Sequence, residues 1–163
     1  MAEALTPEAF RLAIGQFPTG VTVVTTRSDA EDFGTTVSAI CPVCADPPMI
    51  LACLNRFSTT GAAIERSGGF AVNVLSHGQL DLAERFALPG SDFTDVATEP
   101  GRHGEPLLTG ASARLECRTT ELTAHGTHKV FIAAVHRVER RGDDMPLAHF
   151  RGRFGCIAPT VDR

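Results

Sequence analysis

Short β-type segments separated by turn residues constrain this chain more than any other feature of its sequence. Residues 112–122 (SARLECRTTEL) and 128–140 (HKVFIAAVHRVER) alternate apolar and polar side chains, which is typical of strands with one buried face. Residues 20–27 (GVTVVTTR) are rich in β-branched residues, and residues 49–54 (MILACL) form a continuous apolar run. Further strands are expected at residues 35–40, 70–75 and 146–150. The pattern therefore predicts a sheet protein.

Three short helices are expected beside these strands, each behind a hydroxyl residue that can cap it. The capping residues are Thr6, Ser58 and Ser76, and they precede residues 7–17, 59–68 and 77–87. Phe10, Ile14 and Phe17 share one face of the first helix, and residues 89–106, rich in Gly, Pro and Asp, are expected to form an irregular loop. Strand–helix–strand units are too few for a doubly wound sheet. We therefore predict one mostly-β domain over residues 1–163, an antiparallel barrel with short flanking helices.

The composition argues against several classes of function. The chain has 163 residues, enough for one domain with its own core, and 43% of them are hydrophobic and 21% charged, as in ordinary globular domains. The net charge of −4 gives no support for binding to nucleic acid or to an acidic membrane surface. Residues 1–17 lack the basic segment and apolar run of a signal peptide, and no apolar stretch approaches the roughly 20 residues that span a bilayer. We therefore expect a cytoplasmic protein with neither nucleic-acid nor membrane partners.

The tetrapeptide C-P-V-C, with Cys41 and Cys44, raises the question of a thiol redox centre or a metal site. A reactive C-x-x-C needs its first cysteine at the start of a helix, and the D-P-P sequence at residues 46–48 does not allow a helix here. A zinc site needs a second pair of ligands, which neither Cys53 nor Cys117 supplies in a suitable setting. We therefore expect no metal, and we expect the two cysteines of the tetrapeptide to be small loop residues that pack.

Three hydroxyl residues stand at the expected start of the second helix. Ser58, Thr59 and Thr60 lie where free backbone N–H groups and the positive end of the helix dipole favour a phosphate. Their hydroxyl groups add donors for phosphate oxygens. Two interpretations stay open from the residues alone: a phosphate site, or a serine that only caps the helix.

Five segments follow one another in a specific order over nearly the whole chain. They are FPTGVTVVTT (17–26), GTTVSAICPVCADPPMILACLNRFSTTGAAI (34–64), FAVNVLSHGQLDLAERFA (70–87), GTHKVFIAAV (126–135) and HFRGRFG (149–155). Together they resemble the flavin reductase-like family, the small NAD(P)H:flavin oxidoreductases that serve two-component flavin monooxygenases. The resemblance implies an FMN-binding split barrel, a six-stranded antiparallel barrel with Greek-key-like connections. It also implies a homodimer with flavin sites at the subunit interface, FAD or FMN as the flavin, NADH or NADPH as co-substrate, and a monooxygenase component as the recipient of reduced flavin.

The resemblance also implies roles for individual residues. The strand end is expected to face the flavin ring and its ribityl chain through Thr36, Val37, Ser38 and Ala39. The polar edge of the ring is expected to meet the main chain of Cys53, Leu54 and Asn55. The phosphate is expected at Ser58, Thr59 and Thr60, with Arg85 and Phe86 near the phosphate and the ribityl tail. The nicotinamide is expected beside His128 as the catalytic residue, with Arg151 and Phe154 close to the dinucleotide.

Three departures from the family pattern accompany these matches. Cys41, Pro42 and Cys44 replace the usual Ser or Thr, Thr127 replaces an Asp before the histidine, and Phe154 stands where many relatives have Tyr. His128 therefore lacks a carboxylate partner, and the Phe154 ring can stack but cannot donate a hydrogen bond. NADH is preferred to NADPH because no arginine cluster is available for a 2′-phosphate. Two other functions stay open: a flavin-binding protein that does not turn over nicotinamide, and an oxidase of the pyridoxamine-phosphate type.

Overall fold

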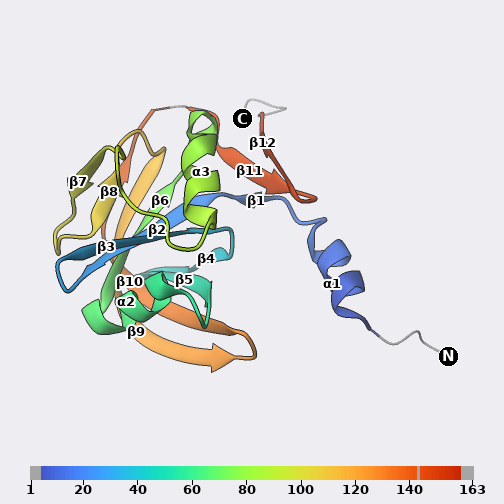
Figure 1. Cartoon of the computed structure of the whole chain (residues 1–163), viewed down its shortest axis with the longest axis horizontal. Helices are drawn as coiled ribbons and strands as arrows, with labels where there is room; N and C mark the ends of the chain where they lie inside the picture. The colour runs from blue at the N-terminus through green and yellow to red at the C-terminus, as the bar shows by residue number, and fades with distance from the viewer. Residues whose placement is uncertain (1–4, 143, 159–163) are drawn as a thin grey trace.

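The computed structural model describes residues 5–142 and 144–158, and its main feature is a sheet of seven antiparallel strands (Figure 1). In spatial order the strands are β3 (Glu31–Val37), β2 (Thr22–Ser28), β6 (Gly69–Val74), β9 (Ala113–His125), β10 (His128–Arg140), β5 (Pro48–Asn55) and β4 (Ile40–Ala45). Each pairing between neighbours is antiparallel. The prediction of a mostly-β antiparallel fold with short helices is confirmed.

Smaller elements surround this sheet. One small sheet joins β1 (Thr19–Gly20), β11 (Leu147–Phe150) and β12 (Arg153–Cys156), and another joins β7 (Thr98–Pro100) and β8 (Pro106–Leu108). The helices are α1 (Pro7–Ile14), α2 (Thr59–Ser67), α3 (Leu80–Ala87) and the short 3₁₀ turn η1 (His77–Gln79). Over residues 5–142 and 144–158, no helix combines the length and the hydropathy needed to cross a bilayer.

The main sheet curls back on itself into a barrel. Residues of β3, at one edge, lie beside β5, which is next to the other edge. Beyond the end of β3, the backbone N–H of Cys53 on β5 donates to the carbonyl oxygen of Ala39 at 3.0 Å. The strand that ends at Val37 thus meets the last residues of β5, and this junction positions the candidate site.

Strand β2 is buried on both faces because it runs between two apolar cores. Val24 belongs to the first core and Val23 to the second. Helix α2 packs against β2, β3 and β6 and adds Ile64 to the first core, whereas α3 adds Phe86 to the second. A strand with two buried faces needs no polar alternation, which explains the β-branched run in the sequence.

Strand β3 can pass over α3 only because residue 34 is glycine. A Cβ atom at Gly34 would lie 2.8 Å from the ring of Phe86, which is closer than real Cβ atoms approach their neighbours. The Phe86 ring also packs against Phe93, with ring centroids 4.9 Å apart. These contacts hold β3, whose last residues line the candidate site, against the second core.

The structure corrects several expectations about the strands. The return strand β3 begins at Glu31 rather than at residue 35. Cys41 and Cys44 were expected to pack in a loop, but both belong to β4 and both are exposed. The expected irregular loop contains β7, and β12 was not predicted. Strand β4 is an edge strand whose residues after Ile40 are all exposed, so its sequence carries no two-residue burial pattern to recognise.

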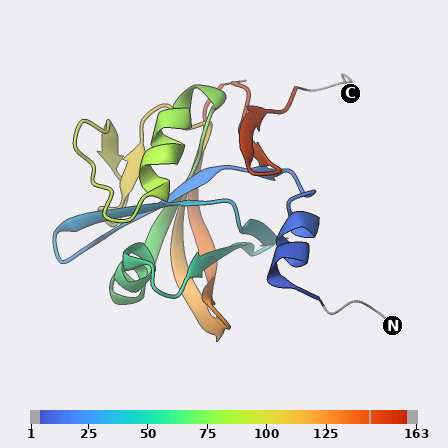
Figure 2. The same cartoon turned by 45° about the vertical axis from the view of Figure 1, so that its right-hand side comes forward.

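Helix α1 is separate from the barrel. The Thr6 hydroxyl caps it as predicted, accepting from a backbone N–H of the first turn at 3.1 Å. None of its residues is buried, and Figures 1 and 2 show it projecting from the body of the molecule. Arg151, in the turn between β11 and β12, donates through its backbone N–H to the Gly15 carbonyl at 3.2 Å and through its guanidinium to Gln16 Oε1 at 2.6 Å.

Candidate functional site

The end of β3 and the end of β5 enclose a hollow of about 260 Å³, here called the strand-end hollow. Its lining consists of Thr35, Thr36, Val37, Ser38, Ala39, Cys53, Leu54, Asn55, Ser58 and His128. Segments far apart in the sequence therefore meet here as the resemblance implied. Most of the residues expected around a flavin ring lie together.

A second hollow of about 470 Å³ opens at the start of α2 and is here called the helix-start hollow. It shares Thr35, Asn55 and Ser58 with the strand-end hollow, so the two are adjacent. Thr59 and Thr60 also line it. The residues expected to hold a phosphate thus stand next to those expected to hold the ring.

The start of α2 is held by a short network of hydrogen bonds. The Ser58 hydroxyl caps the helix, and the Ser58 N–H donates to the Asn55 carbonyl at 2.9 Å. The Asn55 side-chain oxygen accepts from the Phe57 N–H at 2.9 Å. Thr59 and Thr60 are the first residues of the helix, and backbone N–H groups at that position have no acceptor within the helix. Ser58 therefore caps the helix while the next N–H groups stay available for an anion, so the two earlier interpretations are compatible.

His128 reaches the strand-end hollow through the register of β5 and β10, which pairs it with Asn55. The Thr127 hydroxyl oxygen lies 2.9 Å from His128 Nδ1. The Thr127 carbonyl in turn accepts from the Arg56 N–H at 2.9 Å. These contacts orient the imidazole and leave Nε2, on the opposite edge of the ring, for a ligand.

The combined site is suited to an organic cofactor with a phosphate tail. Hydroxyl and backbone N–H donors gather at the start of α2. The wall of the strand-end hollow is formed by backbone atoms and apolar side chains. Burial raises the pKa of the Cys53 thiol, so this cysteine stays protonated near neutral pH and is a poor nucleophile. In the part of the chain that the structure describes, no three His, Cys, Asp or Glu residues gather as metal ligands do.

Arg85 and Phe86 line neither hollow. The Arg85 guanidinium donates to the Thr94 carbonyl, and the Phe86 ring is only 1% exposed in the second core. The Thr36 hydroxyl also has a partner within the chain, because it donates to the Ala83 carbonyl at 2.7 Å. The Thr36 hydroxyl thus joins β3 to α3, and the Arg85 guanidinium joins α3 to the loop that follows it.

Arg151 and Phe154 lie in a different place. They line a third hollow on the β11–β12 hairpin, which shares no residue with the other two. Figures 1 and 2 both show this hairpin on the opposite side of the molecule from the β9–β10 turn, beside which His128 lies. One copy of the chain therefore does not bring these residues to His128.

The helix-start hollow also contains residues that sequence reasoning missed. Phe57 forms part of its rim with a side chain 76% exposed, and residues 87–91 close its other side. Nothing in the local pattern signals these positions, because the loop after α3 approaches α2 only through the tertiary fold. An exposed aromatic side chain beside a concave surface is suited to stacking on a planar ligand.

Residues 14–158 match the family model described as the flavin reductase like domain. The chain belongs to this family. Among its curated relatives, the reductase component of 4-nitrophenol 4-monooxygenase/4-nitrocatechol 2-monooxygenase from Rhodococcus opacus is 43% identical over 151 residues, which cover 92% of this chain and 80% of that protein. A flavin reductase (NADH) from Kitasatospora aureofaciens is 43% identical over 132 residues, covering 78% of this chain and 69% of that protein.

Solved structures of family members share the fold. The NADH:FAD oxidoreductase of Streptomyces globisporus C-1027, solved in complex with NAD and FAD fragments, superimposes with a TM-score of 0.90 at 34% identity, covering 99% of this chain and 100% of that one. Nitrilotriacetate monooxygenase component B from Mycobacterium thermoresistibile gives a TM-score of 0.90 at 31% identity, covering 96% and 89%. The split-barrel fold predicted from the resemblance is thereby confirmed, with seven strands in the main sheet.

Proposed function

We propose that this protein is an NAD(P)H-dependent flavin reductase that transfers a hydride from the nicotinamide to FAD or FMN and supplies reduced flavin to a partner monooxygenase. Membership of the family supports the proposal, as do relatives named flavin reductase (NADH), FMN reductase (NADH) and monooxygenase reductase component. These names favour NADH over NADPH. The structural observation that carries the proposal is that the strand-end hollow and the helix-start hollow are adjacent and share lining residues.

When bound, the flavin supplies the hydride acceptor and the nicotinamide the hydride donor, so the protein needs no nucleophile of its own. The helix-start residues Thr59 and Thr60 would hold the phosphate with backbone N–H groups and hydroxyls. Residues 36–39 and 53–55 would form the wall against the ring, and backbone donors there would favour negative charge on its polar edge. His128 would orient the nicotinamide through Nε2, because its Nδ1 already contacts the Thr127 hydroxyl.

Titration of the purified protein with FMN and with FAD, followed by assays of NADH and NADPH oxidation with each flavin, tests this proposal. We expect NADH loss that depends on added flavin. A yellow protein that is inert toward both nicotinamides would favour the flavin-binding alternative, and oxidation of pyridoxamine phosphate would favour the oxidase alternative. If the protein neither takes up flavin nor oxidises a nicotinamide in the presence of flavin, all flavin-based functions are contradicted.

We also propose that the protein is a homodimer that acts in the cytoplasm. Large exposed apolar side chains at the amino end, such as Phe10 and Phe17, support association with another chain. The five cysteines are all free thiols, as is usual in a reducing compartment.

A further inference from the structure

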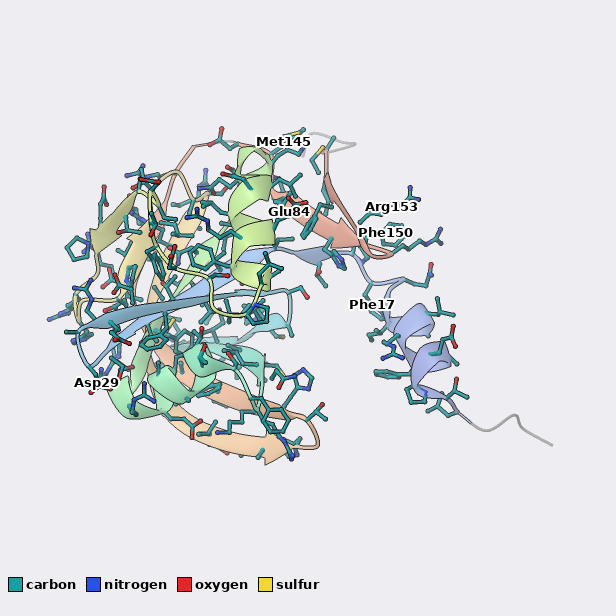
Figure 3. All side chains as sticks on the ribbon, viewed as in Figure 1. Phe17, Asp29, Glu84, Met145, Phe150 and Arg153 are labelled. Atoms are coloured by element: carbon teal, nitrogen blue, oxygen red, sulfur yellow. The ribbon has the colours of Figure 1, made fainter. Side chains whose placement is uncertain are left out.

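A polar hollow of about 310 Å³ lies at the carboxyl end of α2 and is here called the helix-end hollow. Its wall comes from β2 and the turn after it, the last turn of α2, the start of β6, the loop between β7 and β8, and β9. Figure 3 shows Asp29, one of the lining residues, at the lower left of the molecule beside α2. The helix-end hollow shares no residue with the strand-end hollow or the helix-start hollow, so it lies outside the candidate functional site.

The Arg118 guanidinium, on this wall, is a cation without an anionic partner. Its Nη1 donates to the Ser67 carbonyl in the last turn of α2 at 3.3 Å. A Cβ atom at Gly69 would lie 3.1 Å from the same Nη1, so glycine at this position lets the guanidinium lie against the backbone. Within residues 5–142 and 144–158, no carboxylate forms an ion pair with Arg118. Its remaining N–H groups are therefore available for an acceptor.

The Glu105 carboxylate, on the same wall, is an anion without a cationic partner. The residue is 3% exposed, and its Oε2 accepts from the His103 backbone N–H at 3.0 Å. Its Oε1 is buried and has no hydrogen-bond donor among the described residues, and no described Arg, Lys or His side chain forms an ion pair with it. Burial of a charged oxygen without a partner is unfavourable. A donor from outside the chain would remove this cost.

The other Arg and Asp side chains of the lining already have partners of opposite charge. The Arg27 guanidinium donates twice to the Asp32 carboxylate, at 2.6 and 2.8 Å, and the Arg66 guanidinium donates to Asp29 at 3.1 Å. The two groups without partners line the same hollow but form no ion pair with each other. A simple anion would be attracted by one of them and repelled by the other, and the reverse holds for a simple cation. A ligand that carries both charges satisfies both groups.

We propose that the helix-end hollow binds a small zwitterion, a molecule of the amino-acid type whose protonated amine meets Glu105 and whose anionic group meets Arg118. The anionic group is a carboxylate or a phosphate, because a guanidinium offers parallel N–H donors that match both. Since Oε1 is buried, the Glu105 carboxylate turns toward the hollow when the amine binds, a side-chain change that is common on binding. The volume of the hollow lies at the lower end of the roughly 300–1,000 Å³ of small-molecule sites.

Helix α2 separates this hollow from the candidate functional site. Thr59 and Thr60, in its first turn, line the helix-start hollow, whereas Arg66 and Ser67, in its last turn, line the helix-end hollow. A helix of nine residues is about 14 Å long. The zwitterion and the flavin therefore bind at opposite ends of α2, and neither is expected to displace the other.

Thermal-shift scans of the full chain with the standard amino acids and with O-phosphoethanolamine test the proposal, and isothermal titration calorimetry measures each compound that raises the unfolding temperature. We expect at least one compound to bind with one site per chain. A preference for an amino acid identifies a carboxylate ligand, and a preference for O-phosphoethanolamine identifies a phosphate ligand. Acetate, inorganic phosphate and ethylamine carry only one of the two charges and should bind at least about tenfold more weakly. No binding by any zwitterion, or equal binding by the single-charge compounds, would overturn the proposal.

Matched variants locate the binding. Arg118→Gln and Glu105→Gln each remove one charge, and each should weaken binding by about tenfold or more. Arg11→Gln, at an exposed arginine of α1, should leave the affinity unchanged. Circular dichroism checks that each variant is folded, and Arg118→Gln decides alone if Glu105→Gln does not fold. Affinity that survives these changes, or displacement of the zwitterion by saturating FMN, would overturn the proposal. Because binding is measured without flavin or NADH, its result is independent of the proposed reductase function.

Discussion

Two helices of this molecule are nearly equal in length and yet bury different amounts of surface. Helix α2 has nine residues, is capped by Ser58, and buries Thr60, Gly61, Ala63 and Ile64. Helix α1 has eight residues, is capped by Thr6, and buries none. Both carry one apolar side. Amphipathic spacing predicts that a helix needs a cover, but it does not say whether that cover belongs to the same chain. Here α2 completes the core of its own barrel, whereas α1 leaves its apolar side exposed.

Truncation of the matched isoleucines gives the largest expected contrast between the two helices. Ile64→Ala removes a side chain that is 0% exposed in the first core, so the free energy of unfolding should fall by about 2–5 kcal/mol. Ile14→Ala, at a residue 50% exposed, should change it by less than about 0.5 kcal/mol when measured at a concentration where the chain is monomeric. Urea unfolding followed by circular dichroism measures both. Equal losses would mean that α1 packs on its own barrel.

Alkaline pH should distinguish the buried thiol of Cys117 from the exposed thiol of Cys44. Burial, with the nearby charges of Glu105 and Glu116, raises the pKa of the Cys117 thiol from its ordinary 9.0 to about 12. A pKa raised on folding means that the stability is present below pH 9 and is lost as the pH rises toward 12, by on the order of 1 kcal/mol per pH unit. Urea unfolding between pH 8 and pH 10 measures this slope. Cys117→Ala should reduce this slope, and Cys44→Ala, at an exposed thiol of β4, should not.

A change at His128, on β10, should alter the kinetics with NADH but leave the flavin affinity, which we assign to α2, unchanged. His128→Ala removes one hydrogen-bonding group, so the KM for NADH should rise, or kcat should fall, by about fivefold to tenfold. The dissociation constant for flavin should change little, because α2 holds the phosphate. Steady-state kinetics and flavin titration measure the two quantities. Unchanged kinetics would remove His128 from the site.

Removal of the N-terminal caps of α2 and α1 gives the smallest expected difference in stability between the two helices. Ser58→Ala removes the cap of α2 and should lower the free energy of unfolding by about 1 kcal/mol, while weakening flavin binding at the helix start. Thr6→Ala removes the cap of α1, and the unfolding midpoint of the monomer should stay constant because α1 contributes little to its core. Thermal scans at low protein concentration compare the two variants. A similar loss in both would contradict the independence of α1 from the barrel.

The elements that could be predicted from the sequence are those whose apolar side chains are buried within the chain. Strand β2, with its β-branched run, and the capped helix α2 lie where expected, because local preference and burial agree there. The single helix expected at residues 77–87 is the 3₁₀ turn η1 followed by α3, which begins at Leu80 without a side-chain cap. Strand β4 was missed because its residues after Ile40 are all exposed, so Cys41 to Cys44 show no alternation of buried and exposed positions. Strand β3 was shortened because its acidic start and Gly34 have the composition of a turn, although Gly34 is required by the Phe86 ring.

Only part of the candidate site could be predicted from local sequence patterns. The capped helix start at Ser58 could be recognised from the residues alone. The meeting of His128 with Asn55 depends on strand register, which residue spacing does not determine, so it came from the family resemblance. Neither the local patterns nor the resemblance predicted that Arg151 and Phe154 lie apart from His128, because the order of motifs along a chain does not determine their distances in space.

Cys53 lines the strand-end hollow, and its backbone N–H donates to the Ala39 carbonyl at 3.0 Å. The wall of this hollow is therefore held between β5 and the residues that follow β3, although β3 and β5 are not neighbours in the order of the main sheet. A substitution that displaces β5 would change the shape of the hollow without altering any side chain that faces a ligand.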